Sequence, residues 1–267
     1  MTRNLPQHLW SSRWSDPKEI FDGLTEDYDL YRPHYSQTAL LRARDYAGEV
    51  GTAVDVASGT GILTRALRGA FSEATLIGAE PGQDMLAEAA VRTPCSLEIL
   101  WLGSLAEALP FADRSLDLVT VGQAAHWFDR PMFYAECARV LRPGGTLAIF
   151  YNNRVKGSPI AEAHETTLEN ISPGYRRGYR DFSMGDELRT FGGTQDVEWF
   201  TDGWSWERTL EQFVGYVRST SHFKVAIRER PEAEVLAALD SALRPLLGDD
   251  GLLHVPYETN VTLVRFG

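Results

Sequence analysis

The feature that most constrains the fold is an alternation of short apolar runs with amphipathic stretches between Thr52 and Tyr151. The apolar runs have the length of strands, and they read AVDVA, ATLIGAE, LEILWLG, SLDLVTVGQ and GTLAIFYNN. The stretches ILTRALRGAF, GQDMLAEAAVR and RPMFYAECARVLR are typical of helices. Strands that alternate with helices indicate a mostly parallel sheet with helices on both of its faces.

The segments outside this alternation favour other structures. Residues 1–50 are rich in aromatic side chains and are expected to be helical. Residues 157–190 and 207–247 favour helices, with breaks at Pro173-Gly174 and Gly192-Gly193, whereas DVEWFTDGWSWE and YETNVTLVRF favour strands. In the last of these, Val261 and Leu263 share one face and Val264 is out of phase with them. Two strands at the end of a parallel sheet predict an antiparallel edge.

The turn after the first strand is rich in glycine. Asp55 ends the strand, and Gly59 and Gly61 lie in the turn before the helix. Glycines let a ligand approach the backbone, and the helix N-terminus offers free N–H groups. A dinucleotide site favours a third glycine in the pattern G-x-G-x-x-G, but Leu63 and Thr64 stand there instead. An acid before the turn suits a cationic ligand better than a diphosphate.

A second acid, Glu80, closes the next strand about 20 residues after the turn, where a carboxylate can accept both hydroxyls of a ribose. An unliganded turn is the alternative for the glycines, and Glu80 alone would favour an ordinary solvated strand end. Together they predict a site for a nucleoside-like ligand that carries positive charge.

The composition excludes several other functions. The formal net charge of −11 disfavours a nucleic-acid substrate, and the most basic stretch, GYRRGYRDF, is short. The sequence has no run of about 18 apolar residues, so no transmembrane helix is expected. The start of the chain, MTRNLPQHLWSSRW, lacks the apolar core of a signal peptide. Cys95 and Cys137 are expected to be reduced, and no H-x-x-x-H or C-x-x-C spacing predicts a metal site. We therefore expect a cytoplasmic protein that binds neither nucleic acid, membrane nor metal.

The motifs AEALPF, AAHWFD and LRPGGTL complete a set with DVASGTG and GAEPGQDML. In this set the sequence resembles the class I S-adenosylmethionine (SAM)-dependent methyltransferases, well over residues 28–152 and more loosely over the whole chain. It is similar to the small-molecule branch that includes trans-aconitate methyltransferase-like proteins, where YRPHY and GYVRSTSHF also have counterparts. The resemblance implies an α/β fold with a Rossmann-like, doubly wound, mostly parallel seven-stranded sheet, an antiparallel edge and a helical cap.

The same resemblance implies a division of the chain and a set of cofactor contacts. A helical lid would span 1–50, the SAM-binding core 51–153, and the acceptor-binding cap with the final strands 154–267. The implied contacts are Asp55, Ala57, Gly59 and Gly61 under the methionine part of SAM, Glu80 at the ribose, Pro81 and Met85 beside the adenine, Leu105, Ala106 and Glu107 at the adenine edge, Gln123 under the sulfonium, and Tyr28 and Arg32 over the amino acid end. Ala57 replaces a usual glycine and Leu105 a frequent Asp, so the turn is narrower and adenine recognition depends more on the Ala106 backbone.

Methyl transfer from a sulfonium requires mainly orientation and a dry pocket. Aromatic rings suit the sulfonium, and the candidates are Tyr28, Tyr31, Trp127, Phe128 and Tyr151, with core packing as the alternative for about half of them. A neutral acceptor needs a base, for which His126 follows a strand end, with a structural loop role as its alternative. Tyr31, His34 or the more distant His222 are other candidates for the base. A carboxylate acceptor needs only an arginine, Arg154 or Arg218.

The helical residues after Tyr151 are expected to form the acceptor wall, with Tyr216 and Phe223 of YVRSTSHF facing the methyl group. The sequence therefore predicts a SAM-dependent methyltransferase for a small molecule, either a small organic acid or an aromatic secondary metabolite, with S-adenosylhomocysteine as product. A SAM-binding protein without catalysis stays open as an alternative, and a nicotinamide oxidoreductase is disfavoured by the missing third glycine. The acceptor and the oligomeric state stay open too.

Overall fold

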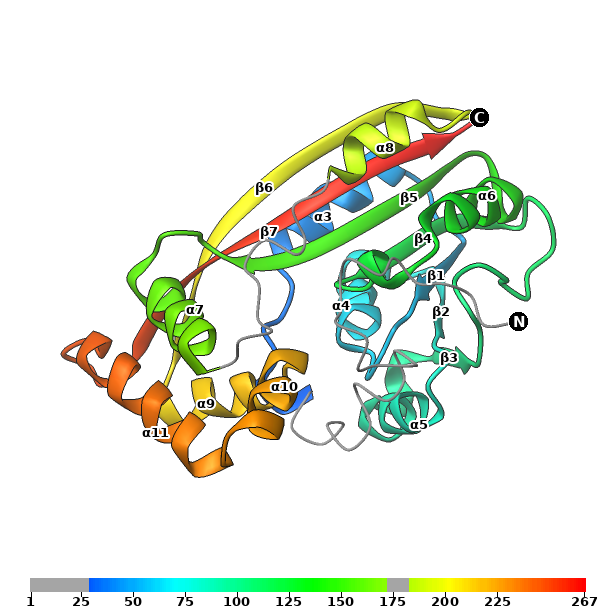
Figure 1. Ribbon diagram of the computed structural model, residues 1–267. Coiled ribbons are helices and arrows are strands. Elements are labelled where there is room, and N and C mark those ends of the chain that lie inside the picture. Colours follow the sequence, from blue (N-terminus) through cyan, green and yellow to red (C-terminus); the bar gives the residue numbers. More distant parts are fainter. Residues whose placement is uncertain (1–28, 172–182) are drawn as a thin grey trace. The chain divides into compact units, whose positions relative to one another are not determined.

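A computed structural model describes residues 29–171 and 183–267 of the chain. Most of the predicted lid, Tyr28 and the break at Pro173-Gly174 therefore lie outside the described residues. The described chain forms a seven-stranded sheet in the order β3-β2-β1-β4-β5-β7-β6 (Figure 1). Its strands are β1 (Thr52–Val56), β2 (Thr75–Ala79), β3 (Ile99–Leu102), β4 (Leu116–Gly122), β5 (Leu141–Arg154), β6 (Thr194–Arg208) and β7 (Leu253–Phe266).

The sheet is mostly parallel, as the alternation of strands and helices predicts. The strands β1 and β2 pair in parallel, as do β1 with β4, β2 with β3, and β4 with β5. β7 and β6 follow β5 in the strand order and form the antiparallel edge. The Rossmann-like fold class predicted from the sequence is therefore confirmed.

Helices connect these strands. The α-helices described are α3 (Gln37–Ala47), α4 (Ile62–Ala70), α5 (Gln83–Arg92), α6 (Arg130–Val140), α7 (Pro159–Ile171), α8 (Met184–Thr190), α9 (Leu210–Arg218), α10 (Ser221–Glu229) and α11 (Glu232–Leu243). Short 3-10 helices are η1 (Cys95–Leu97), η2 (Ala125–Trp127) and η3 (Arg244–Leu246). No helix in the described ranges combines the length and the apolar character that crossing a membrane requires.

The described residues divide into two compact units, each built from three separate segments. We call residues 34–152, 183–202 and 259–267 the core unit, and residues 29–33, 153–171 and 203–258 the helical unit. The division into three continuous ranges that the family resemblance implies stays a prediction.

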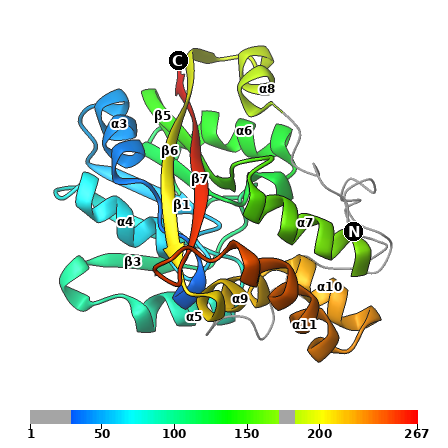
Figure 2. The ribbon, with the colours of Figure 1, turned by 90° about the vertical axis from the view of Figure 1, so that its left-hand side faces the viewer.

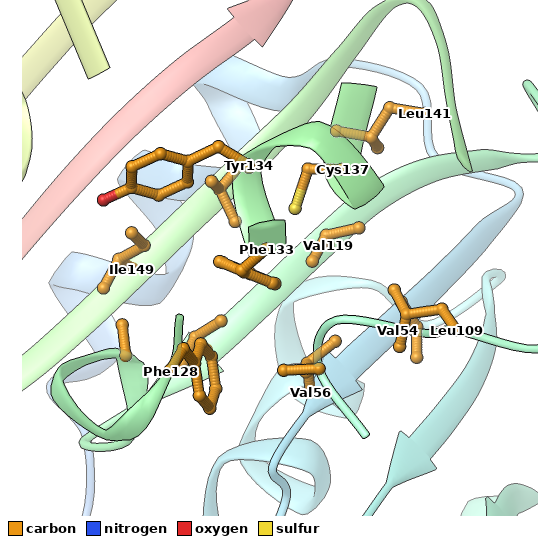
Figure 3. Close-up of a cluster of buried hydrophobic side chains, with 14 of the residues drawn as sticks. Val54, Val56, Leu109, Val119, Phe128, Phe133, Tyr134, Cys137, Leu141 and Ile149 are labelled. Carbon is orange, nitrogen blue, oxygen red and sulfur yellow. The ribbon is translucent and has the colours of Figure 1, made fainter. Parts of the chain in front are cut away.

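The core unit buries two apolar clusters because neighbouring strand residues point to opposite faces of the sheet. Val54 and Val56 of β1 lie in one cluster with Phe133 and Cys137 of α6 (Figure 3). Ala53 faces the other cluster, which receives the apolar sides of α3 and α4. β1 is thus covered on both sides, which explains why AVDVA is an almost continuous apolar run.

The helical unit has an apolar cluster of its own. The helices α7, α9, α10 and α11 contact one another and group together (Figure 2). Phe213 of α9, Leu239 of α11 and Tyr257 of β7 are among the fully buried members of this cluster.

In the strand β7, the alternation of apolar residues along the sequence does not predict which side chains are buried. Val261 and Leu263 join the cluster with α3 and α4, as their shared face predicts. Val264, which is out of phase, is equally buried and joins the cluster of α6. Both faces of this strand are covered within the core unit, so apolar residues of either phase are buried.

Candidate functional site

The turn after β1 has a backbone that glycine favours. Gly59 has φ +56° and Gly61 has φ +85°, both in the left-handed region. Gly61 is the N-cap of α4, and a Cβ there would lie 2.5 Å from the Trp101 ring. A larger residue at position 61 would therefore clash, whereas the space around Gly59 is open. Ala57 also has positive φ, 53°, so the sequence departure noted above leaves an alanine in a conformation that costs it energy.

Glu80 is hydrogen-bonded to the backbone of this turn. Its Oε2 accepts a hydrogen bond from the Gly59 N–H at 2.9 Å, and its Oε1 accepts one from the Gly82 N–H at 2.8 Å. The Ser58 N–H donates to the Ala79 carbonyl at 3.2 Å, which joins the turn to the end of β2. The glycine turn and the carboxylate thus lie together at the carboxyl edge of the sheet, where ligands of α/β proteins bind.

Asp55 points into the core unit rather than into solvent. It is 2% exposed, and its carboxylate accepts hydrogen bonds from the hydroxyls of Thr64 at 2.6 Å and Thr120 at 2.9 Å. Burial raises the pKa of Asp55 to about 7, although the two threonine hydroxyls oppose the shift. These contacts join β1, α4 and β4 directly beneath the turn. They give Asp55 a role in positioning the turn that the sequence pattern did not indicate.

The loop after β4 is anchored to β5. Gln123 has φ +58°, its N–H donates to the Phe150 carbonyl at 2.9 Å, and its Nε2 donates to the Asn152 carbonyl at 2.5 Å. Asn152 in turn donates from Nδ2 to the His34 carbonyl and accepts at Oδ1 from Thr259. Asn152 therefore fixes three separate segments of the core unit at this edge. No sequence motif indicated it.

His126 lies in η2 and is 5% exposed. The Tyr151 hydroxyl oxygen accepts from the His126 N–H at 3.0 Å and lies 3.2 Å from His126 Nδ1. The Trp127 ring is half-buried, with its centroid 4.9 Å from that of His126. Phe128 packs edge-on against Phe133 in the core, which agrees with the packing alternative stated for the aromatic candidates.

Tyr35 reaches the same edge from the segment before α3. A Cβ on Gly122, the last residue of β4, would lie 2.4 Å from the Tyr35 hydroxyl oxygen, so glycine is required there. The ring of Tyr35 packs edge-on against Phe150. His34 beside it has an exposed side chain. Tyr35 was missed in the sequence because the motif YRPHY gives no sign of which tyrosine turns inward.

The remaining predicted cofactor residues of the core unit lie near the ends of β2 and β3. Met85 and Ala106 are buried, Pro81 is half-buried, and Leu105 is largely exposed. Glu107 accepts at Oε1 from the Asp129 N–H at 2.9 Å, which ties this loop to the start of α6.

The other predicted residues belong to the helical unit. Tyr31 packs its ring on Gly215, and Arg32 donates from Nε and Nη2 to Ser219. Arg154 donates to the Tyr216 hydroxyl at 2.7 Å and to Glu165 at 2.8 Å. Three predicted residues remain. Arg218 is exposed and pairs with Glu232, His222 is half-buried, and Phe223 lies in the apolar cluster of the helical unit. No three His, Cys, Asp or Glu side chains gather as metal ligands within the described part of the chain.

Comparison with known proteins assigns the central part of the chain. Residues 54–149 match the family model described as a methyltransferase domain. This central part of the chain is similar to a methyltransferase domain. A protein of Dictyostelium discoideum that is named as a methyltransferase is 28% identical over 92% of this chain and 94% of its own length. The malonyl-[acyl-carrier protein] O-methyltransferase of Hahella chejuensis is 41% identical, but over only 35% of this chain and 34% of its own.

Solved structures show the same fold. A methyltransferase structure from Anaeromyxobacter dehalogenans aligns with a TM-score of 0.63 and 23% identity, over 89% of this chain and 97% of that one. A SAM-dependent methyltransferase from Geobacter sulfurreducens, solved with S-adenosylhomocysteine, aligns with a TM-score of 0.53 and 17% identity over 93% and 98% of the chains. A methyltransferase domain of this fold implies SAM as its cofactor.

The residues of the methyltransferase domain fit this cofactor. The Gly59 backbone is open, with no atom within 4 Å of the position that a Cβ would take. The two backbone N–H groups that donate to Glu80 hold its carboxylate beside this open backbone. The Ser58 hydroxyl in the same turn is buried and has no hydrogen-bond partner among the described residues. An open backbone beside a fixed carboxylate is the arrangement that a ribose-bearing ligand needs.

Proposed function

We propose that the protein is a SAM-dependent methyltransferase that acts on a small-molecule acceptor, either a small organic acid or an aromatic metabolite, and releases S-adenosylhomocysteine. One observation carries the proposal: within the methyltransferase domain, Glu80 is hydrogen-bonded to the backbone of the glycine turn. That contact supports the proposal because it holds a carboxylate beside an open backbone at the ligand-binding edge of a parallel sheet.

The proposed cofactor roles are those that the family resemblance implies. Gly59 and Gly61 lie under the methionine part, Glu80 accepts the ribose hydroxyls, and Pro81 with Met85 flanks the adenine. Leu105, Ala106 and Glu107 form the adenine edge, and Gln123 lies beneath the sulfonium. When bound, SAM supplies an electrophilic methyl group on a positively charged sulfur. The residues of the chain orient the two reactants and exclude water.

His126 is the proposed base for an acceptor that must lose a proton. A neutral imidazole has one donor and one acceptor nitrogen. If Nδ1 carries the proton and donates to the Tyr151 hydroxyl oxygen, Nε2 is left to receive the acceptor's proton. Tyr151 is then a positioning residue, since its hydroxyl contacts Nδ1 and holds the ring.

The cofactor assignment is tested by calorimetry with S-adenosylhomocysteine. The Glu80→Gln variant is expected to bind it about tenfold or more weakly than the wild type, because a hydrogen bond to a charged group contributes about 1.5–3 kcal/mol. Glu73→Gln, an exposed glutamate before β2, is the matched control and should leave the affinity unchanged. Equal affinity of Glu80→Gln and the wild type would contradict the ribose assignment.

Catalysis is tested separately from binding. Wild-type protein and methyl-labelled SAM are incubated with a small-molecule extract, and labelled products are separated by mass. Transfer of the label to a compound of low mass supports the enzyme. Binding of S-adenosylhomocysteine without any transfer, over a range of extracts, would favour a SAM-binding protein without catalysis.

A further inference from the structure

The helical unit contains buried hydrogen-bond donors that lack an acceptor. Among them are the Nε of Arg154, the indole N–H of Trp206 and the hydroxyl of Tyr257, none of which has a hydrogen-bond partner among the described residues. Tyr257 is 2% exposed and Trp206 4%. A buried donor without an acceptor costs about 1–3 kcal/mol, so three of them near one another require an explanation.

A series of contacts through the Tyr216 ring connects these three donors. The Arg154 guanidinium lies 5.6 Å from the centre of the Tyr216 ring, and the Tyr216 ring contacts Trp206 at 5.3 Å between centroids. Trp206 in turn contacts Tyr257 at 5.5 Å. Arg32 lies over the Tyr216 ring at 5.6 Å, so a second guanidinium is close to the same ring. The residues of the cluster come from β5, β6, β7, α9 and the segment before α3, and each of these residues belongs to the helical unit.

The protonation states of the side chains in and beside this cluster determine which of them can donate a hydrogen bond. Burial raises the pKa of Tyr257 well above its ordinary value, so its hydroxyl keeps its proton. Although burial alone would raise the pKa of Glu165, contact with His164 and Arg154 lowers it to about 2, and the carboxylate is charged. Burial and the charge of Arg154 lower the pKa of His164 to about 4, so His164 adds no positive charge near neutral pH.

Glu165 uses only part of the guanidinium. Arginine has five N–H donors, and the described bonds of Arg154 run from Nη1 to Tyr216 and from Nη2 to Glu165. The side chain of Arg154 is 14% exposed. A planar carboxylate matches a guanidinium edge, and its single charge is repelled by Glu165 less than that of a phosphate. The rings of Trp206 and Tyr257 suit the apolar part of an organic acid.

We propose that the cluster of Arg154, Tyr216, Tyr257 and Trp206 binds the carboxylate of a small organic acid. The carboxylate accepts from Arg154 and from the Tyr257 hydroxyl, which satisfies donors that the chain itself leaves unpaired. The acid is either the methyl acceptor or a separate ligand of the helical unit, and the shared chemistry is the carboxylate.

The test compares benzoate and succinate with the neutral benzamide by calorimetry. The wild type should bind at least one of the two acids, and benzamide about tenfold or more weakly than benzoate. The Tyr257→Phe variant should bind the same acid about tenfold more weakly. Without ligand it should melt no lower than the wild type, because the substitution removes a buried donor that has no acceptor. This variant avoids Arg154→Gln, which would leave Glu165 without its arginine.

Tyr134→Phe is the matched control, since Tyr134 is a buried tyrosine of the core unit whose hydroxyl donates to Glu187. It should leave acid binding unchanged. Benzamide binding as tightly as benzoate, unchanged affinity in Tyr257→Phe, or no binding of either acid would each overturn the proposal. Binding of S-adenosylhomocysteine by Tyr257→Phe is measured in parallel, so a failure here is distinguished from a failure of the cofactor site.

Mass analysis of the bound acid after incubation with SAM separates the two sources of the carboxylate. A gain of one methyl group identifies the acid as the acceptor. An unmodified acid that still requires the Tyr257 hydroxyl for binding identifies a separate ligand. Either result supports the carboxylate site.

Discussion

Asp55 is a carboxyl group that the fold keeps out of water. Its pKa is about 7 in the folded protein and 3.8 in a model compound, so the folded state binds this proton more tightly. The contribution of Asp55 to the free energy of unfolding is therefore greatest below about pH 4, and it falls as the pH rises toward 7. Above that pH the carboxylate is charged in both states, and the contribution is constant.

Replacing Asp55 by Asn should remove this pH dependence. Between pH 5 and pH 8 the wild type is expected to lose about 2–3 kcal/mol more unfolding free energy than Asp55→Asn, since one pKa unit corresponds to about 1.4 kcal/mol. Urea unfolding at several pH values measures the difference. Asp249→Asn, an exposed position, serves as control. Parallel stability curves for the wild type and Asp55→Asn would contradict the shift.

At the scale of elements, Arg68 joins the end of α4 to the two segments that lead into β2 and β3. Its guanidinium donates to the carbonyls of Phe71, Ser72, Ala74, Leu97 and Glu98. The fork of an arginine can reach several carbonyls at once, and the single ammonium of lysine cannot. Arg68 therefore fixes the helix that carries the glycine turn against the neighbouring strands.

Arg68→Met should lower the free energy of unfolding by about 2–3 kcal/mol, because it keeps the apolar stem and removes every donor. Arg68→Lys should fall between this variant and the wild type. Arg44→Met removes a surface arginine paired with Asp45 and should change stability by less than about 0.5 kcal/mol. Urea unfolding measures the free energy of unfolding of each variant. An Arg68→Met variant as stable as Arg44→Met would show that these carbonyls do not need the arginine.

At the scale of the whole molecule, ligand binding should stabilise selected segments. S-adenosylhomocysteine at about 100 times its dissociation constant stabilises the form that binds it by about 2.7 kcal/mol. We expect amide hydrogen exchange to slow at 57–61, 80–82 and 122–128, which meet at the carboxyl edge. Residues 232–243 of α11, in the helical unit, serve as the internal control. Slowing confined to α11 would place the cofactor elsewhere.

The sequence by itself determined the features that depend on neighbours along the chain. Strand and helix periods are local, so the alternation between Thr52 and Tyr151 predicted the parallel sheet, and the order of its elements is confirmed. The glycine turn and Glu80 were predicted as one site because their spacing along the chain is that of a ribose-binding acid after such a turn. Their hydrogen bond agrees with that placement.

Tertiary structure alone decided which distant side chains meet. Asp55 reads in the sequence as a partner for a cation, but packing surrounds it with Thr64 and Thr120 and raises its pKa. Arg154, Tyr216 and Tyr257 come from three segments of the chain, and no periodicity links them. Burial by separate elements removes water from such groups, and only then do an unpaired donor or a shifted pKa arise. A pattern along the chain carries no information about that loss of water.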